Sequence, residues 1–332
     1  PILADRGETI GRGQVAFGFN YQYFSFDHLD GVPFTAIPAV FRHDDYQSTP
    51  GRSDVISTAN TINATVGQST AALTYGLTDR IDISAALPII STTLSLLSNA
   101  TVQRVGTGPD LKTHYFLDPL APDGIHGSTH QFFATGSATG VGDVLLRGKA
   151  MLMKEGSRAL AAGLDVRFPT GDEENLLGSG AYGLRPFAAF SGSYRSLTPH
   201  VNVAYQWNGR SLLAGDVATR RKADLPDQFI YAAGADVSVN QRFSVIVDVL
   251  GQRILDSPRV STVPFTATGP FGSVNLEDIT FSSTSYWTTY GSVGMKANLA
   301  PRLLINFNLR FALNDNGLTD RLTPLIGAEW AF

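Results

Sequence analysis

Apolar side chains alternate with small or polar ones in segment after segment, and this pattern restricts the possible folds more than any other feature. The first such segment, at residues 14–26, carries on one face Val15, Phe17, Phe19, Tyr21 and Tyr23. Successive side chains of a strand point to opposite sides, so the alternation predicts a strand. It returns near residues 64–77, 81–89, 143–152, 160–168, 182–193, 200–207, 228–238, 243–249, 285–299, 303–311 and 325–332. The chain is therefore predicted to be all-β, with twelve strands.

One face of almost every strand lacks charge entirely, whereas the opposite face is rich in Gly, Ala, Ser and Asn. Charged residues make up only 16% of the 332 residues, against about 25% in a typical globular domain. A soluble sandwich would crowd its outer face with Lys and Glu. An uncharged outer face suits lipid, and small inner residues suit the interior of a narrow barrel. We therefore predict a single antiparallel transmembrane β-barrel of twelve strands.

The composition excludes several other classes of protein. No window approaches the ~18 apolar residues of a transmembrane helix, and the 33 Gly argue against a helical bundle. The chain has no Cys, which excludes disulfides and cysteine-ligated metals. Its net charge of −4 argues against a nucleic-acid partner.

The connections between the expected strands alternate strictly between short and long. The short ones lie at 78–80, 154–158, 195–198, 240–242 and 298–301, and the long ones at about 27–62, 98–138, 170–181, 208–227, 254–283 and 314–321. Outer-membrane barrels combine short periplasmic turns with long extracellular loops. The sequence thus predicts an up-and-down meander in the bacterial outer membrane, with both termini in the periplasm.

We expect one domain, with residues 1–12 forming a short periplasmic segment and residues 13–332 forming the barrel. Residues 1–12 lack the charged and apolar regions of a signal peptide, so Pro1 is interpreted as lying close to a processed mature end. A segment of this length contains no plug domain, which argues against a TonB-dependent transporter. At the other end, Trp330 and Phe332 resemble the C-terminal signal that outer-membrane proteins present to the barrel-insertion machinery. The alternative is an ordinary strand end.

Four motifs carry a resemblance to a known family: YGLTDRIDISAALP at 75–88, TGVGDVLLRGK at 139–149, DVRFPTGD at 165–172 and LGSGAYG at 177–183. They resemble the outer-membrane transporters named after the MetA pathway of phenol degradation. The similarity extends with lower specificity from about residue 8 to Phe332. The resemblance implies a barrel and uptake of aromatic or other hydrophobic small molecules, and it supplies no catalytic residue.

The alternation of side-chain direction along each strand places a set of ionisable residues on the inner face. These candidate lumen residues are Asp82, Asp143, Arg147, Lys149, Asp165, Arg167, Arg185, His200, Asp236, Asp248, Lys296, Arg310 and Glu329. Apart from His200 they comprise six acids and six bases. Half-buried charges must pair, since each otherwise costs several kcal/mol. The balance favours a bracing ladder or a weakly selective pore over a strongly ion-selective constriction.

The long loops contain many apolar residues, among them Phe34, Phe41, Phe132, Phe133 and Phe265. Exposed apolar patches usually contact something. One interpretation is that these loops fold into the mouth and bind an apolar ligand. The others are a lid of packed loops and contact with the outer lipid leaflet.

No motif indicates a cofactor, metal or catalytic site. Gly178–Gly183 matches GxGxxG but lacks the strand before and the helix after that a dinucleotide site needs. The loop histidines, at 28, 43, 114, 126 and 130, show no metal-ligand spacing. His200 is the one histidine on an expected strand and the best candidate base for a hydrolase, but no serine can be paired with it.

The function expected from the sequence is passive uptake of small molecules through an outer-membrane channel that is not an enzyme, and the resemblance implies that these molecules are aromatic or hydrophobic. The first alternative is a closed, salt-bridged barrel that acts through its loops as a binding or structural module at the cell surface. The second is an outer-membrane hydrolase. The sequence does not indicate an oligomeric state.

Overall fold

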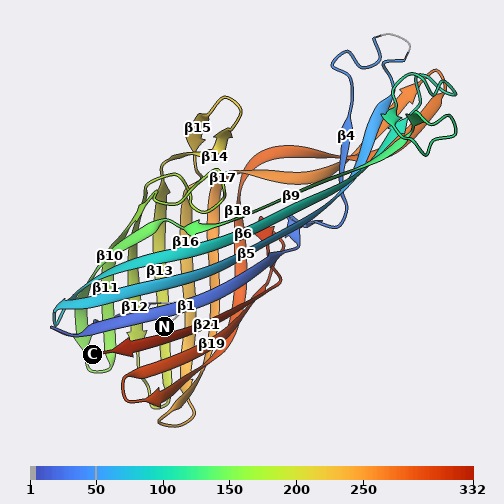
Figure 1. Cartoon of the computed structure of the whole chain (residues 1–332). Coiled ribbons are helices and arrows are strands. Elements are labelled where there is room, and N and C mark those ends of the chain that lie inside the picture. The colour runs from blue at the N-terminus through green and yellow to red at the C-terminus, as the bar shows by residue number, and fades with distance from the viewer. Residues whose placement is uncertain (1–4, 49–50) are drawn as a thin grey trace.

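A computed structural model, which describes residues 5–48 and 51–332, shows a closed antiparallel barrel (Figure 1). In order around the wall its strands are β1 (Val15–Phe26), β5 (Val55–Thr78), β6 (Ile81–Gln103), β10 (Val144–Glu155), β11 (Arg158–Phe168), β12 (Gly183–Gly192), β13 (Leu197–Asn208), β16 (Gln228–Ser238), β17 (Phe243–Gly269), β18 (Gly272–Ala300), β19 (Leu303–Ala312) and β21 (Leu322–Ala331). Each strand pairs with the next, and β1 pairs with β21 to close the ring. The expected twelve-stranded meander is confirmed.

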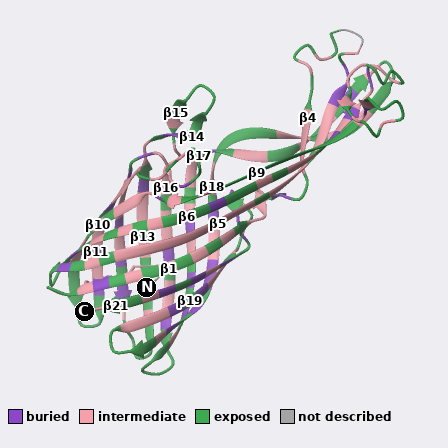
Figure 2. Ribbon diagram, in the orientation of Figure 1, coloured by how far each residue is buried: buried purple, intermediate pink, exposed green. Residues whose placement is uncertain are grey.

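The outer face of the wall is apolar although it is exposed. Phe17, Leu73 and Val247 leave 45%, 51% and 51% of their surfaces uncovered, and exposure alternates from residue to residue along β1 (Figure 2). Aromatic residues mark the two ends of this band. Phe243 begins β17, and Arg253, ten residues later, pairs with Trp287. Ten residues of a tilted strand rise about 25 Å, the height of the apolar band of a membrane barrel.

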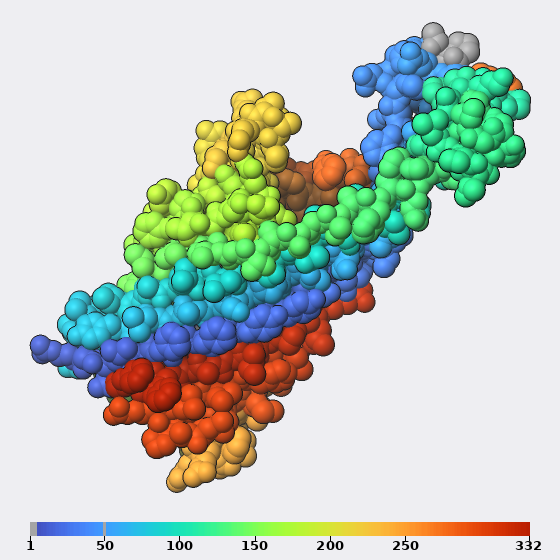
Figure 3. Space-filling view, viewed as in Figure 1, coloured from blue at the N-terminus to red at the C-terminus, as the bar shows by residue number. Residues whose placement is uncertain are grey.

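Several strands continue far beyond the barrel and form a stalk (Figures 1 and 3). We define the stalk as the outer parts of β5 and β6, the end of the β17–β18 hairpin, β9 (Thr129–Val141) on β6, and β4 (Ile37–Phe41) on β5. Val55, Val105 and Ala267 form a small core at its tip. The expected loop at 254–283 is thus almost entirely strand, and about half of the described residues at 27–62 and 98–138 are in strands, which corrects that prediction. These strands stay paired beyond the membrane. No lipid requires an apolar face there, so their Ser, Thr and Asn residues show no alternation in the sequence.

The wall contains one interrupted strand. Both β9 and β10 pair with the same edge of β6, one after the other, with only Gly142 and Asp143 between them. Gly142 donates a backbone hydrogen bond to Pro88 O (2.8 Å), and a Cβ here would lie 2.7 Å from Ile90 Cδ1. The loop that follows β11 seals this break, because Thr170 Oγ1 donates to the carbonyl of Gly142 (2.7 Å).

The remaining strands belong to the extracellular loops. They are β2 (His28–Leu29), β3 (Val32–Pro33) and β20 (Leu318–Thr319) in one small sheet, β7 (Phe116–Leu117) with β8 (His126–Gly127), and β14 (Arg210–Asp216) with β15 (Arg221–Asp224). Among the residues described, no helix is long and apolar enough to cross a membrane.

Candidate functional site: the barrel lumen

The lumen encloses a cavity of about 930 Å³. Its lining is mostly polar and comes from strands all around the wall. Seven of the lumen residues expected from the sequence line it: Asp82, Arg147, Lys149, Arg185, Asp236, Lys296 and Glu329. The cavity is also lined by residues of the chain that precedes the barrel, among them Asp5, Arg6 and Glu8.

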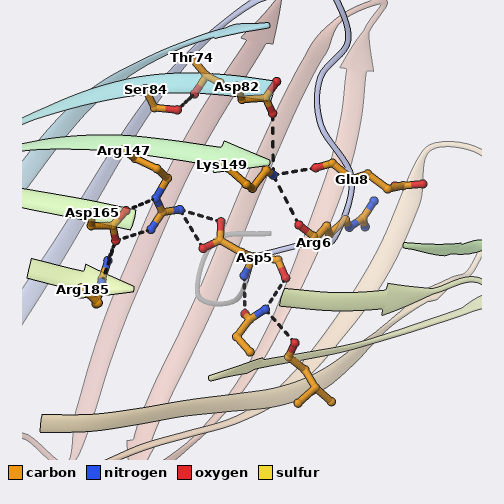
Figure 4. A network of polar contacts seen from close by, with 12 residues as sticks. Asp5, Arg6, Glu8, Thr74, Asp82, Ser84, Arg147, Lys149, Asp165 and Arg185 are labelled. Atoms are coloured by element: carbon orange, nitrogen blue, oxygen red, sulfur yellow. Dashed lines mark hydrogen bonds and ion pairs between the residues drawn. The ribbon is translucent and has the colours of Figure 1, made fainter. Parts of the chain in front are cut away.

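Arg147, Asp165 and Arg185 form a row across three neighbouring strands. Strand pairing sets Arg147 of β10 opposite Asp165 of β11, and Asp165 opposite Arg185 of β12. Asp165 is 1% exposed and accepts hydrogen bonds from Arg147 Nε (2.6 Å) and Nη2 (2.9 Å) and from Arg185 Nε (2.8 Å) and Nη2 (2.5 Å). One buried carboxylate thus holds two guanidinium groups (Figure 4).

The first described residues, from Asp5 to Glu8, lie against the inner wall (Figure 4). The chain then leaves the lumen, and the Arg12 amide donates to Asp79 in the periplasmic turn that follows β5 (3.2 Å). The inner-wall position of residues 5–8 differs from the periplasmic position expected for them, whereas residues 1–4, with Pro1 and its interpretation, lie outside the described residues. Arg147 Nη1 donates to both carboxylate oxygens of Asp5, at 2.9 and 2.8 Å. The backbone of Asp5 exchanges two hydrogen bonds with the Asn202 side chain (2.5 and 2.7 Å). The physical reason for the position is charge complementarity between the segment and the wall.

Three further contacts hold the same segment. Arg6 forms an ion pair with Asp236 on β16, and Lys149 Nζ donates to the Glu8 carbonyl (2.7 Å). Gly7 donates its N–H to Ser191 Oγ (3.0 Å), and a Cβ on Gly7 would clash with the backbone carbonyl of Ala159. The segment can therefore lie flat on β11 only because residue 7 is glycine. Sequence reasoning missed this segment, although three charged residues within four positions were a signal that it needs partners.

The next strands around the wall, β13, β16, β17 and β18, carry a second group of buried charges. Lys296 Nζ bonds both oxygens of Asp236 (3.1 and 3.2 Å), and His200 Nε2 lies 2.8 Å from Asp248 Oδ1. The His200 side chain is fully buried, and its Nδ1 has no hydrogen-bond partner within residues 5–48 and 51–332. Both ring nitrogens therefore lack a serine hydroxyl, so His200 is not arranged as the base of a hydrolase.

Asp143, Arg167 and Arg310 lie away from the cavity. Asp143 occupies the break between β9 and β10, accepts hydrogen bonds from the amides of Gly171 (3.1 Å) and Ser179 (2.7 Å), and lies 3.7 Å from Arg167. Arg310 lies over the ring of Tyr290, 4.5 Å from its centroid. Asp143 and Arg167 contact the loop that follows β11, and their role in the lumen stays a prediction.

Four of the five candidate loop phenylalanines lie on stalk strands rather than in loops over the lumen. Phe34 is buried, whereas Phe41, Phe132, Phe133 and Phe265 lie on strands of the stalk. A second cavity, of about 230 Å³, lies at the stalk tip. Its walls are mainly apolar and include Phe41, Val55, Val102, Tyr115 and Phe116.

A hydrogen-bonded chain of side chains borders that second cavity. His43 Nε2 lies 3.1 Å from His114 Nε2, and His114 Nδ1 lies 3.0 Å from Asp54 Oδ2. Burial of Asp54 acts to raise its pKa, but hydrogen bonds from His114, Thr107 and the neighbouring amides together hold the pKa below its ordinary value. In the described part of the chain, no group of three or more His, Asp or Glu side chains could hold a metal ion.

The C-terminal strand end carries the two expected assembly residues on its outer face. The rings of Trp330 and Phe332 stack with centroids 5.7 Å apart, and about half of each side chain is exposed. The insertion signal itself remains an expectation from the sequence.

Comparison with solved structures agrees with this fold. An outer membrane channel from Pseudomonas putida F1 matches with a TM-score of 0.55 and 14% identity, over 98% of this chain and 97% of that one. Two other barrels match less closely. The NanC porin has a TM-score of 0.44 and 8% identity, over 89% of this chain and 98% of that one. The toluene transporter TbuX of Ralstonia pickettii has a TM-score of 0.33 and 13% identity, over 97% of this chain and 90% of that one.

No curated protein matches the chain at a significant level. A family model described as "Putative MetA-pathway of phenol degradation" matches residues 41–262, which is most of the chain. The closed barrel with its lipid-facing surface places the protein in the bacterial outer membrane. The chain therefore belongs to this family, as its motifs at 75–88, 139–149, 165–172 and 177–183 indicated.

Proposed function

We propose that the protein is an outer-membrane channel through which small organic molecules pass by diffusion. The observation that carries the proposal is the polar, charge-lined cavity of about 930 Å³ inside a closed barrel. A barrel that served only as a scaffold would have no need of so large a polar interior. The family description adds support for aromatic compounds as the solute class.

The segment at residues 5–12 bears on how such a channel would open. It runs along the inner wall beside the cavity and is held by side-chain contacts to β10, β13 and β16 rather than by strand pairing. Contacts of this kind can break without disturbing the wall. The channel would then have a closed state, with the segment docked, and an open state, with the segment displaced.

Planar-bilayer recording tests the proposal with the full chain and with a variant that lacks residues 5–9. Discrete openings are expected for both, with a larger conductance for the variant. A silent bilayer with both proteins would refute the channel, because the variant removes the docked segment as an explanation for silence.

The stalk favours one other function, a binding module at the cell surface. Its tip carries the separate apolar cavity of about 230 Å³, far from the lumen along β5 and β6. A module of this kind would bind a small apolar ligand whether or not the barrel conducts. Binding of toluene to the purified protein, lost on Val102→Arg while conductance is unchanged, would support this function in addition to the channel.

A further inference from the structure

The guanidinium group of Arg147 makes two different kinds of carboxylate contact. Through Nε and Nη2 it bonds Asp165, a buried residue of the wall that Arg185 shares. Through Nη1 it bonds both oxygens of Asp5, which belongs to the N-terminal segment that lies along the inner wall. One edge of the Arg147 guanidinium group thus bonds the wall. The other edge faces the cavity and bonds a carboxylate of the N-terminal segment.

The charges of the wall at this position do not balance without the segment. Three bases lie here: Arg147, Lys149 and Arg185. Two wall acids face them: Asp165, which bonds both arginines, and Asp82, whose carboxylate is 3.9 Å from Lys149 Nζ. With the segment displaced, the wall would carry one surplus positive charge beside the cavity. The Asp5 carboxylate supplies the one negative charge that is missing.

The wall also holds the Arg147 side chain in a fixed orientation. Its guanidinium group lies over the ring of Phe187, 4.6 Å from the centroid. That ring lies flat on β11 because Gly163 has no side chain there, and a Cβ on Gly163 would clash with the ring. Since Asp165 and Phe187 both restrain the guanidinium plane, its Nη1 edge stays directed into the cavity when Asp5 leaves. A preorganised donor of this kind binds a carboxylate with little loss of side-chain entropy.

We propose that the Nη1 edge of Arg147 is a carboxylate-binding subsite of the lumen, and that Asp5 occupies it as an internal substitute for the ligand. The ligand class is small organic monocarboxylates, and their binding releases the segment. The proposal rests on the proposed channel function for its role in transport, but the subsite itself can be tested by binding alone.

Benzoate is the probe, and benzyl alcohol, of similar shape without the charge, is its control. Calorimetric titration of the detergent-purified full chain should show benzoate binding about tenfold more tightly to Asp5→Asn than to the original chain, because a charged competitor with two hydrogen bonds is lost. Arg147→Lys keeps the charge but removes the planar set of N–H donors. In the Asp5→Asn background it should abolish the gain in benzoate affinity. Arg242→Lys, which alters another base at the cavity, should leave benzoate binding unchanged.

Hydrogen exchange provides a second measurement. If Arg147 had only a structural role, benzoate would not change the exchange rates of the N-terminal segment. Benzoate should accelerate exchange of the amides of Gly7 and Ile10, which are bonded to Ser191 and Asp82, whereas benzyl alcohol should not. Equal benzoate affinity in the original chain and in Asp5→Asn, or equal binding of benzyl alcohol, would overturn the subsite. Benzoate binding by a protein that never conducts would instead refute the channel and leave the subsite standing.

Discussion

Replacing Leu73 by Arg should destabilise the barrel strongly, whereas replacing the adjacent Ala72 by Arg should not. Leu73 is 51% exposed on the outer face of β5 and lies five residues from Thr78, the periplasmic end of that strand. Five residues of a tilted strand rise about 12 Å, which is close to the middle of an apolar band about 25 Å tall. A cation placed on the lipid face at this depth costs about 2–4 kcal/mol.

Ala72 has the same depth but the opposite direction. It lines the cavity, and its paired neighbours are Gly18 on β1 and Ala86 on β6. These small residues leave room for a long side chain, and the lumen can hydrate its charge. The expected cost for Ala72→Arg is therefore below about 1 kcal/mol, which leaves a difference between the two variants of at least about 1 kcal/mol, or about fivefold in the folding equilibrium.

Reversible unfolding in phospholipid vesicles by guanidinium measures this difference, followed by the fluorescence of the three tryptophans of the chain. Leu73→Ala serves as the control, because it removes the leucine without adding a charge. Equal costs for the two arginine variants, or a larger cost at Ala72, would contradict the assignment of inner and outer faces.

Three further predictions concern other parts of the molecule. Asp165→Asn should lower the free energy of unfolding by about 3–5 kcal/mol in the same assay, since it leaves two buried arginines without their shared acid; a cost below about 1 kcal/mol would show that they are solvated. Since the pKa of Asp54 in the folded protein lies below its ordinary value of 3.8, its carboxylate stabilises the stalk tip above about pH 4, and this contribution is lost as the pH falls through the lowered pKa. His114→Ala should raise that pKa, as an NMR titration of the carboxyl carbon would record, and an unchanged titration would argue against the hydrogen bond. Removal of Phe332 should slow insertion by the cellular machinery more than spontaneous folding into vesicles, and equal slowing of both would favour an ordinary strand end.

The alternation along the chain predicted both the existence of the strands and the direction of their side chains. Phe17, Leu73 and Val247 had to face lipid and Asp82 and Lys296 had to face inward, because a strand has only two faces and the membrane tolerates charge on one of them. The same reasoning failed at 27–62, 98–138 and 254–283. Outside the membrane the constraint on one face disappears, so a strand rich in Ser, Thr and Asn looks like a loop in the sequence.

The register of the strands and the position of the N-terminal segment were decided only by the tertiary structure. Parity places Arg147, Asp165 and Arg185 inside, but only the pairing of three strands puts them in one row. The sequence likewise shows the charges of Asp5 and Arg6 without their partners, which lie on β10 and β16, far along the chain. Side-chain direction is a local property of a strand, and the alternation therefore determined it. Charge pairing across a lumen depends on the closure of the whole ring, and no local pattern in the sequence contains that information.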